Sequence, residues 1–546
     1  MKQILLTSAA LVAMIFASCS KENGGEAPNP GSTGMAYLSI RVDARSQTRA
    51  SSENDGLPAE STLKKLYLIT FTEAGNVVAV PGSTLYYNEI DATDPGVGYT
   101  DKKPKAVKIS DASKNLVVIA NPGDELLKAI TGLTSSSTFG TFNAAIAKTT
   151  TADIVSTKGF AMITSRSDAG MNTGAKILEP YVAINGKIKI VTGTGTGTEQ
   201  SARAAAEADR LDVSLERLAA KLVVTANPTK ITAPDNAAVA LTEWTVDAVN
   251  TTYYPFAEKT LIDVAHTSNL NGYAKNFYTK DPNFYKDPVL GYAKGLEYTK
   301  IDPDTYAPVL PFTYTWKTPG DASDPARIAY VIENTMAATD QVYGSATRII
   351  MKATYYPEFD VAAGYVAGND WFSWAGTYYP SLKALQDVYA DAESATSALK
   401  AACESFLTKV KGIAAAGVPA NATFDELTQT QLDKIANGGQ VVKDGNNPVI
   451  RWYQKGQCYY SYEVRHDNET EVSMAFAKYG VVRNNWYDLT LNSVKGPGTP
   501  WYPQSTDPGD GDPDPRDDID KQAGYLGVSV KINPWIIWTT GMNDID

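Results

Sequence analysis

The sequence predicts a mainly β protein of two β-sandwich domains, the second of which carries a small helical insertion. Short stretches with alternating apolar side chains recur along the chain and are separated by Gly, Asn, Asp and Pro, which is typical of sandwiches. The 31 tyrosines favour half-buried strands. A sustained helical period appears only near residues 381–438. The length of 546 residues allows about two to four domains.

The first residues have the features of an export signal. Lys2 precedes an apolar run that ends at Phe16, and this run is too short for a membrane helix, which needs about 20 residues. Ala-Ser-Cys follows and matches a lipobox, in which Cys19 is lipidated and becomes the new N-terminus. A polar, Gly/Pro-rich stretch then fits a tether. We expect a lipoprotein signal peptide at 1–19; an ordinary signal peptide with an incidental cysteine is the alternative.

The stretch YLSIRVDARSQTRASSEND, residues 37–55, changes character half-way. Its first half alternates like a strand with one buried face. The side chains expected to face inward are Ala36, Leu38, Ile40, Val42 and Ala44. Those expected to face outward are Tyr37, Ser39, Arg41, Asp43 and Arg45. The second half has no periodicity and is rich in turn formers, so we predict an exposed loop that contains Arg49.

A low-complexity segment, TGTGTGTEQSARAAAEAD at 192–209, separates the two predicted domains. It lacks the GxGxxG spacing and the strand–helix context of a phosphate site, so we interpret it as a linker. Residues 50–208 are assigned to the N-terminal domain and 209–532 to the C-terminal domain. The pattern LVV-x-ANP occurs in both and weakly favours two similar β domains.

The predicted insertion contains two helices. Apolar residues with spacings of three and four form the first stripe, which comprises Leu382, Leu385, Val388, Tyr389, Ala392, Leu399, Cys403, Phe406 and Val410. Thr423 and Glu426 form a capping box that starts the second helix, and Gly438 ends it. Because Cys403 lies on the stripe, a buried thiol is favoured over a disulfide with Cys458, although an oxidising compartment keeps the disulfide open.

Composition argues against several functions. The net charge of −12 and the lack of a basic block argue against nucleic-acid binding. With His266 and His466 as the only histidines, and without HExxH, GxSxG, CxxC-pair or P-loop motifs, catalysis is poorly supported. We therefore expect no enzyme and no cofactor. The 61 acidic residues do not single out a glycosidase pair.

Two clusters were considered as binding sites. Asp510, Asp512 and Asp514 have the spacing that starts a calcium loop, but Pro515 replaces the required glycine and Lys521 the bidentate glutamate. A solvated loop at 507–520 is favoured, with weak cation binding left open. The aromatic residues of 369–380 offer stacking surfaces for sugar rings, although packing of the insertion onto the sandwich is favoured. They are Trp371, Phe372, Trp374, Tyr378 and Tyr379.

Four places in the chain resemble the Bacteroidales fimbrillins, or type V pilins. They are the lipobox at Cys19, the junction Arg49–Ala50, the stretch VSLERLAAKLVV, and the ending GVVRNNWYDLTLNSV…YLGVSVKINPW. The resemblance spans nearly the whole chain, and the ending is its most specific part. Within the family, the chain is most similar to the shaft subunit of the short, or minor, fimbriae. The resemblance implies a non-enzymatic protein with transthyretin-like, Greek-key sandwiches.

The resemblance also implies a route to assembly. The precursor is exported to the outer membrane as a palmitate-bearing lipoprotein, and an Arg-specific surface protease cuts between Arg49 and Ala50. Residues 20–49 then leave, and the C-terminal segment of another copy fills the groove vacated by the first strand. The groove positions are Ala36, Leu38, Ile40 and Val42. The implied product is an extracellular fimbria for adhesion and virulence, with anchor and tip subunits and host or bacterial adhesion targets as partners.

The donor is assigned to the tail at 533–546. This tail is apolar up to Trp538 and needs a partner to cover it. The proposed donor side chains are Ile536, Trp538 and Met542. Residues 525–532 alternate more cleanly but are expected to belong to the second domain's own sheet. The alternative functions are a fimbrial anchor or tip subunit and a surface glycan-binding lipoprotein that uses the 369–380 aromatics.

Overall fold

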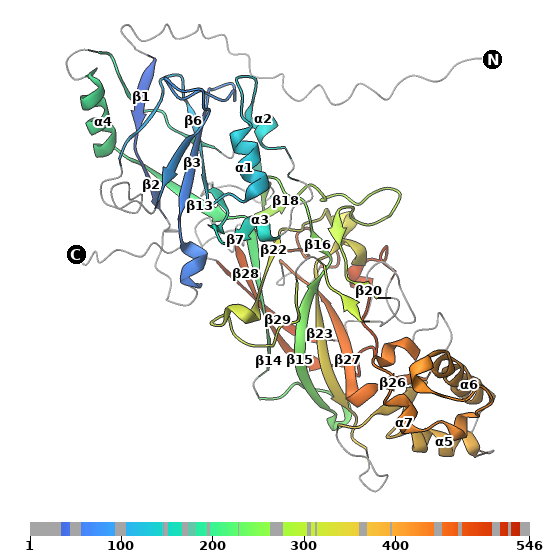
Figure 1. Cartoon of the computed structure of the whole chain (residues 1–546). Helices are drawn as coiled ribbons and strands as arrows, with labels where there is room; N and C mark the ends of the chain where they lie inside the picture. The colour runs from blue at the N-terminus through green and yellow to red at the C-terminus, as the bar shows by residue number, and fades with distance from the viewer. Residues whose placement is uncertain are drawn as a thin grey trace, which may run out of the picture.

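The computed structural model shows an elongated, mainly β molecule with three consecutive parts (Figure 1). A β domain from the first part of the chain lies at one end, a larger β-sandwich lies in the middle, and a helical module lies at the other end. None of the described helices is long and apolar enough to span a membrane. The structure describes residues 34–43, 56–92, 105–144, 146, 151–165, 174, 176–177, 181–193, 197–227, 229–262, 277–302, 307–311, 314–359, 368–391, 393, 396–441, 450–467, 472–504, 514–521 and 526–534.

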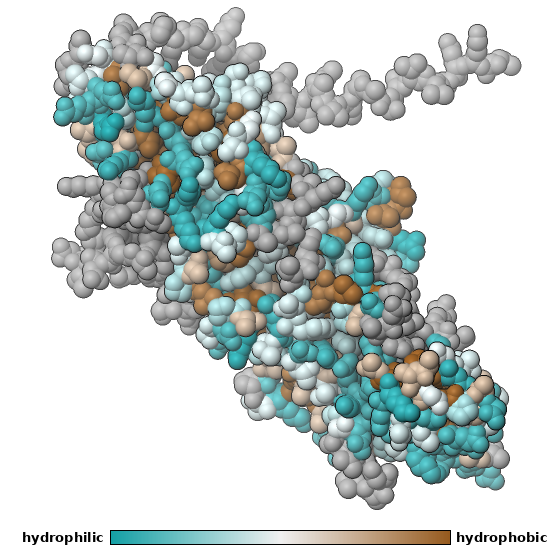
Figure 2. Space-filling view, in the orientation of Figure 1, coloured by the Kyte–Doolittle hydropathy of each residue, from teal (hydrophilic) through white to brown (hydrophobic). Residues whose placement is uncertain are grey.

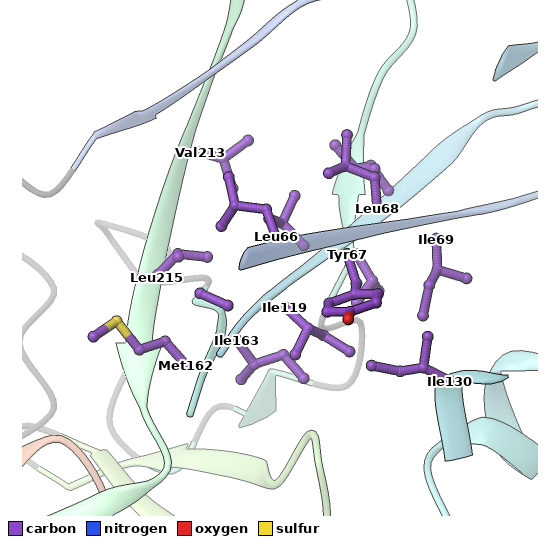
Figure 3. Packing of buried hydrophobic residues seen from close by; sticks show 14 of the residues in the cluster. Leu66, Tyr67, Leu68, Ile69, Ile119, Ile130, Met162, Ile163, Val213 and Leu215 are labelled. Carbon is purple, nitrogen blue, oxygen red and sulfur yellow. The ribbon is translucent and has the colours of Figure 1, made fainter. Parts of the chain in front are cut away.

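The first domain is organised around a seven-stranded sheet. Its main order is β2 (Ile40–Asp43), β13 (Leu211–Arg217), β9 (Met162–Thr164), β6 (Asn115–Ala120), β3 (Lys65–Phe71) and β4 (Asn88–Asp91), with β11 (Val182–Ala183) beside β6. β6 is buried along its whole length, which explains its unbroken apolar sequence LVVIA. Leu66, Ile119, Ile163 and Val213 come from four of these strands and share one core (Figure 3).

A second, smaller sheet completes this domain. It has the order β12 (Lys189–Ile190), β1 (Met35–Leu38) and β5 (Val107–Ser110). Four helices belong to the same part of the chain: α1 (Asp124–Thr131), α2 (Phe139–Phe142), α3 (Thr151–Ile154) and α4 (Glu199–Ala208). Leu126 and Ile130 of α1 are fully buried in the core. The domain therefore has a helix-covered β core.

The second domain is a sandwich of two sheets. One has the order β22 (Ile328–Ile332), β14 (Ala219–Ala226), β28 (Asn485–Val494) and β29 (Leu526–Pro534). The other has the order β15 (Ala238–Asp247), β23 (Arg348–Tyr356) and β27 (Gln457–Glu463). Leu222 and Leu489 from the first sheet share a buried cluster with Trp244 and Met351 from the second.

Short paired strands and 3₁₀ turns lie between the larger elements of the described chain. The strands are β7 (Val155–Ser156) with β8 (Gly159–Phe160), β10 (Lys176–Ile177) with β17 (Glu258–Leu261) and β18 (Phe277–Lys280), β16 (Val249–Asn250) with β19 (Leu296–Glu297), and β20 (Lys300–Ile301) with β21 (Pro308–Val309). Short 3₁₀ turns are η1 (Pro58–Ser61), η3 (Pro234–Asn236), η6 (Pro325–Arg327), η7 (Ala338–Asp340), η8 (Tyr343–Ser345), η10 (Ala414–Ala416), η11 (Phe424–Glu426), η12 (Gly438–Val441), η13 (Gln454–Gly456) and η14 (Ile519–Lys521).

The helical module is an insertion between β23 and β27, which pair with each other. It contains β24 (Trp371–Trp374), β25 (Thr377–Tyr379), β26 (Arg451–Tyr453), α5 (Leu382–Ala390), α6 (Ser397–Gly412) and α7 (Gln429–Leu432). The predicted insertion is thus present, but its first stripe is split. Asp391 caps the end of α5, and the side chain of Thr396 accepts a hydrogen bond at the start of α6.

The second predicted helix is also divided. Thr423 and Glu426 form the expected capping box, but it starts only the 3₁₀ turn η11. A second box, made by Thr428 and Gln431, starts α7. Cys403 and Cys458 are both buried free thiols in different clusters, and burial raises the pKa of each thiol to about 12. The buried thiol predicted at Cys403 is confirmed.

The connection between the seven-stranded sheet of the first domain and the four-stranded sheet of the second differs from the linker expected at 192–209. The segment 192–209 ends in the helix α4, which packs against β1 through Ala202 and Ala206. β13, assigned from sequence to the start of the second domain, pairs with β2 and β9 of the first sheet. The next strand, β14, belongs to the second sheet, and only Leu218 separates the two strands.

Candidate functional site

The first described strand links the two sheets of the first domain. β1 lies between β12 and β5 and is antiparallel to both, whereas β2 is parallel to β13. At the break between β1 and β2, the backbone N–H of Leu211 donates to the carbonyl oxygen of Ser39 at 2.8 Å. Residues 35–43 therefore complete the hydrogen bonding of three neighbouring strands.

One face of this strand lies in the core, as the alternation predicts. The exposed fractions of Ala36, Leu38, Ile40 and Val42 are 0, 0, 1 and 3%. All four belong to the cluster that contains the core residues of Figure 3. Burying one large aliphatic side chain contributes about 1.5–3 kcal/mol, so this face is a substantial part of the domain's stability.

The opposite face is also buried, which the sequence interpretation did not foresee. Tyr37 and Ser39 have no exposed surface, and α4 lies over β1 at Tyr37. The ring of Tyr37 packs with Ala202 and Ala206 of α4, together with Val191 and Ala106. The small residues at a spacing of four, after the N-cap Thr198, were the available signal for a packed helix.

The hydroxyl of Tyr37 has specific partners on α4. It donates a hydrogen bond to the carboxylate of Glu199, and Arg203 Nη2 donates to it at 3.3 Å. The guanidinium of Arg203 lies 4.9 Å from the ring centroid of Tyr37. Burial, followed by the bond to Glu199, raises the pKa of the Tyr37 phenol, and the same bond lowers the pKa of Glu199. The phenol is therefore the donor at neutral pH.

Polar contacts hold α4 in place independently of the strand. Asp209, which caps α4, pairs with Lys187 at 2.5 Å and Lys189 at 2.7 Å. These two lysines lower the pKa of Asp209 to about 2. The backbone N–H of Ala106 donates to Glu207 Oε1 at 3.0 Å. The helix is thus tied to the chain beside β12 and β5, the two neighbours of β1.

The end of the strand is more exposed. Arg41 Nε and Nη2 donate to the two carboxylate oxygens of Asp212, each at 2.8 Å. The side chains of Arg41 and Asp212 are 29 and 52% exposed. An exposed pair of this kind contributes at most about 1 kcal/mol, so the pair fixes the register of β2 on β13 more than it stabilises the domain.

The chain after the predicted protease loop is anchored at the junction between the domains. In η1, the Glu60 carboxylate is buried and pairs with the buried Lys221 of β14 at 2.9 Å. Tyr330 of β22 donates to Glu60 Oε1 at 2.5 Å, and Arg217 Nε donates to the Glu60 carbonyl oxygen at 2.8 Å. This cluster joins the segment that follows the loop to the second domain's sheet.

The last described strand lies in a different setting. β29 pairs with β28 from Leu526–Val494 to Pro534–Asn485 and forms the end of its four-stranded sheet. Leu526, Val528 and Val530 are only partly buried against the second core. The expectation that this segment belongs to the second domain's own sheet is met.

Several predicted site residues lie outside the described part of the chain. They are Cys19, Arg49, Ala50, Ile536, Trp538 and Met542, together with Ala44, Arg45, His266, Asp510 and Asp512. In the part of the Asp-rich loop that is described, Asp514 pairs with Arg516 at 2.7 Å. The described residues contain no group of three or more His, Cys, Asp and Glu side chains arranged to hold a metal.

The aromatic residues at 369–380 pack the helical module onto the sandwich. Trp371 and Phe372 are fully buried, and Trp371 stacks on Tyr453 with ring centroids 3.8 Å apart. Tyr379 is 8% exposed. The visible face of the module is mostly hydrophilic (Figure 2). These three buried rings are unavailable for stacking on sugars, whereas Trp374 and Tyr378 are half-buried. The packing interpretation is confirmed for Trp371, Phe372 and Tyr379, and the glycan site loses these three rings.

Residues 451–540 match the family model of the C-terminal part of fimbrillin, the major fimbrial subunit protein type IV. The matched region runs from β26 through β28 and β29. It therefore includes the strand at the end of the second sheet and its partner, as well as the first residues of the tail. No curated protein matches the chain.

Several solved structures are similar over long stretches. A fimbrilin from Porphyromonas gingivalis has 12% identity and a TM-score of 0.35, over 93% of this chain and 99% of that one. The tip fimbrial protein Mfa3 from the same organism, with a C-terminal truncation, has 11% identity and a TM-score of 0.31, over 92 and 100%. A fimbrial assembly protein from Parabacteroides distasonis has 12% identity and a TM-score of 0.21, over 56 and 96%.

Proposed function

We propose that this chain is a structural subunit of a cell-surface fimbria that polymerises by protease-triggered exchange of its first strand. The observation that carries the proposal is the setting of residues 35–43, which pair with three strands, are buried along the inward face at 36–42, and are buried on the opposite face at Tyr37 and Ser39. In the sequence, this strand leads directly into a polar stretch with Arg45 and Arg49. The match of residues 451–540 to fimbrillin supports the same function.

The energetics favour replacement of the strand once it leaves. Its loss would expose an apolar groove and unpaired backbone groups, which are costly in water and readily pair with another extended segment. A segment from a second copy restores both kinds of contact. Because donor and groove are different surfaces of one chain, each added copy leaves a new groove or donor free, and the product is a fibre.

The groove has walls that do not depend on the strand. Asp209 and Glu207 tie α4 to the chain beside β12 and β5. The cluster around Glu60 holds the chain that follows the loop. We therefore infer that the processed subunit keeps an open groove rather than collapsing.

The finer steps of the proposal follow the resemblance. Cys19 carries the lipid that anchors the precursor to the outer membrane, and an Arg-specific surface protease cuts between Arg49 and Ala50. The C-terminal segment is the donor, either through residues 525–532 or through the tail with Ile536, Trp538 and Met542. The partners are other copies, anchor and tip subunits, and adhesion targets on host or bacterial cells. The role is that of a shaft subunit of the short fimbriae.

The test is electron microscopy of the purified precursor before and after digestion with an Arg-specific protease. Filaments are expected only after digestion, with a new N-terminus at Ala50. The variant Arg49→Ala should stay monomeric, whereas the matched control Arg41→Ala, which changes an arginine inside β2, should still be processed. Filaments from undigested protein, or a fully processed protein that remains monomeric, would show that the proposal is wrong.

A further inference from the structure

We propose that the incoming strand places Tyr525 of a second copy in the pocket that Tyr37 occupies, with residues 526–530 following in the positions of residues 38–42. This inference rests on the proposed strand exchange and specifies its register. It selects residues 525–530, rather than the tail beyond Pro534, as the part of the donor that enters the groove.

The pocket under α4 has the chemistry to recognise a tyrosine. Its walls are the small side chains of Ala202, Ala206 and Ala106 and the apolar side chain of Val191. The Glu199 carboxylate accepts the phenol's hydrogen bond at the mouth of this pocket. An isoleucine would leave that carboxylate without the bond, and an indole is bulkier than the phenol ring that the alanines now contact.

The two ends of the chain share a sequence that fits this pocket. Residues 37–42 read YLSIRV and residues 525–530 read YLGVSV. Tyrosine, leucine and the last valine are identical, and Val528 differs from Ile40 by one methylene group. The three aliphatic positions are those that point into the core at Leu38, Ile40 and Val42.

The differences between the two stretches follow the burial of the first one. Ser39 is fully buried, and its counterpart is Gly527, which is smaller still. Arg41, the position with a 29% exposed side chain, has the unrelated counterpart Ser529. At the buried positions the counterparts are identical or smaller, and at the exposed position the counterpart is unrelated, which is the pattern expected of two strands that fit one groove. The stretch WIIW at 535–538 contains no tyrosine.

The position of β29 supports its transfer. Among the described residues it pairs with β28, and the side chains of Leu526, Val528 and Val530 are half-buried. In the groove, Leu526 would take the pairing that Leu38 makes with β5, and residues 528–530 would take the pairing that residues 40–42 make with β13. Transfer therefore exchanges partial burial of the aliphatic side chains for full burial.

The register is tested by cross-linking the full-length protein after digestion with the Arg-specific protease. The variant Ala202→Cys with Tyr525→Cys should give a ladder of covalently linked subunits in the presence of a short bismaleimide reagent. The comparison variant, Ala202→Cys with Ile537→Cys, tests the tail register and should give at least about tenfold less cross-linking. The native thiols of Cys403 and Cys458 are buried and contribute little background.

Two controls make each outcome decisive. The undigested variant Tyr37→Cys with Ala202→Cys must cross-link within one chain, which confirms that the reagent reaches across the pocket. Filaments that cross-link at Ile537, or at neither position, overturn this inference and leave strand exchange intact. Wild-type protein that is cut but forms no filaments overturns the proposed function itself.

A second measurement does not depend on cysteine variants. Tyr525→Phe keeps the ring but removes the hydroxyl, and it should speed filament disassembly in urea about three- to tenfold. Glu199→Ala should have a similar effect, and the double variant should be no worse than either single one, because both remove the same bond. Tyr285→Phe, at an exposed tyrosine outside the groove, should leave disassembly unchanged. Independent, additive effects of Tyr525→Phe and Glu199→Ala would contradict the pocket assignment.

Discussion

The first and last strands of the described chain share an apolar alternation but lie in opposite settings. β1 and β2 bury one face in the core, α4 covers the other face of β1, and together the two strands pair with three others. β29 stands last in the order of its sheet, pairs with β28 among the described residues, and has half-buried side chains at Leu526, Val528 and Val530. The comparison teaches that surroundings, rather than pattern, determine how firmly a strand is held. Four predictions test this contrast, from the largest expected effect to the smallest.

The junction at Glu60 anchors the chain that follows the first strand and contacts β14, which pairs with β28. We expect Glu60→Ala to lower the free energy of unfolding of the precursor by about 3–5 kcal/mol, because it leaves the buried Lys221 without its carboxylate. Urea unfolding measures this change. The control Glu89→Ala breaks an exposed pair with Lys65 and should cost at most about 1 kcal/mol. Equal losses would show that the junction is not a critical contact.

The two strands themselves give the second prediction. Ile40→Ala should destabilise the precursor by about 2–5 kcal/mol because it opens a cavity in a closed core. Val530→Ala removes fewer atoms from a half-buried site and should cost on the order of 1 kcal/mol. Parallel urea titrations of the two variants measure both losses in the free energy of unfolding. A loss at Val530 as large as the loss at Ile40 would remove the contrast drawn above.

The contact between Tyr37 and α4 gives a smaller effect. Tyr37→Phe keeps the buried ring but loses the hydrogen bond to Glu199, so the free energy of unfolding should fall by about 0.5–1.5 kcal/mol. Tyr285→Phe is the matched control, because Tyr285 is 62% exposed. Thermal melts of both variants provide the measurement. An unchanged Tm for Tyr37→Phe would argue against a stabilising hydrogen bond between Tyr37 and Glu199.

The smallest expected effect is the pH dependence of the ion pairs that Asp209 forms with Lys187 and Lys189. Lys187 and Lys189 lower the pKa of Asp209 from 3.8 to about 2. Its stabilising contribution is therefore present above the unfolded value and is lost as pH falls from about 4 to about 2. Hydrogen exchange of α4 amides should increase over this window. In Asp209→Asn the Asp209 component should vanish, and an unaltered pH profile in that variant would assign the change to other groups.

The sequence predicted the inward face of the first strand because alternation reports directly which side chains avoid water. It missed the burial of Tyr37, since the cover of this side chain comes from α4, about 160 residues later in the chain. The Ala-rich stretch looked like a linker because small side chains give a helix little apolar contrast. The helical insertion was found from its period, but the break between α5 and α6 was not, as the apolar spacing continues across it.

The single-residue join at Leu218 has a mechanical consequence for a fibre of such subunits. A strand held in the groove lies parallel to β13 along residues 211–214, so tension along it loads these ladder bonds together in shear. β13 then passes the load through Leu218 into β14, which is itself parallel to β28 over six residue pairs. Resistance to forced extension is set by the unfolding rate rather than by equilibrium stability. This continuous β path, with no slack segment between the domains, would let a fibre transmit pull from flow without lengthening at its joints.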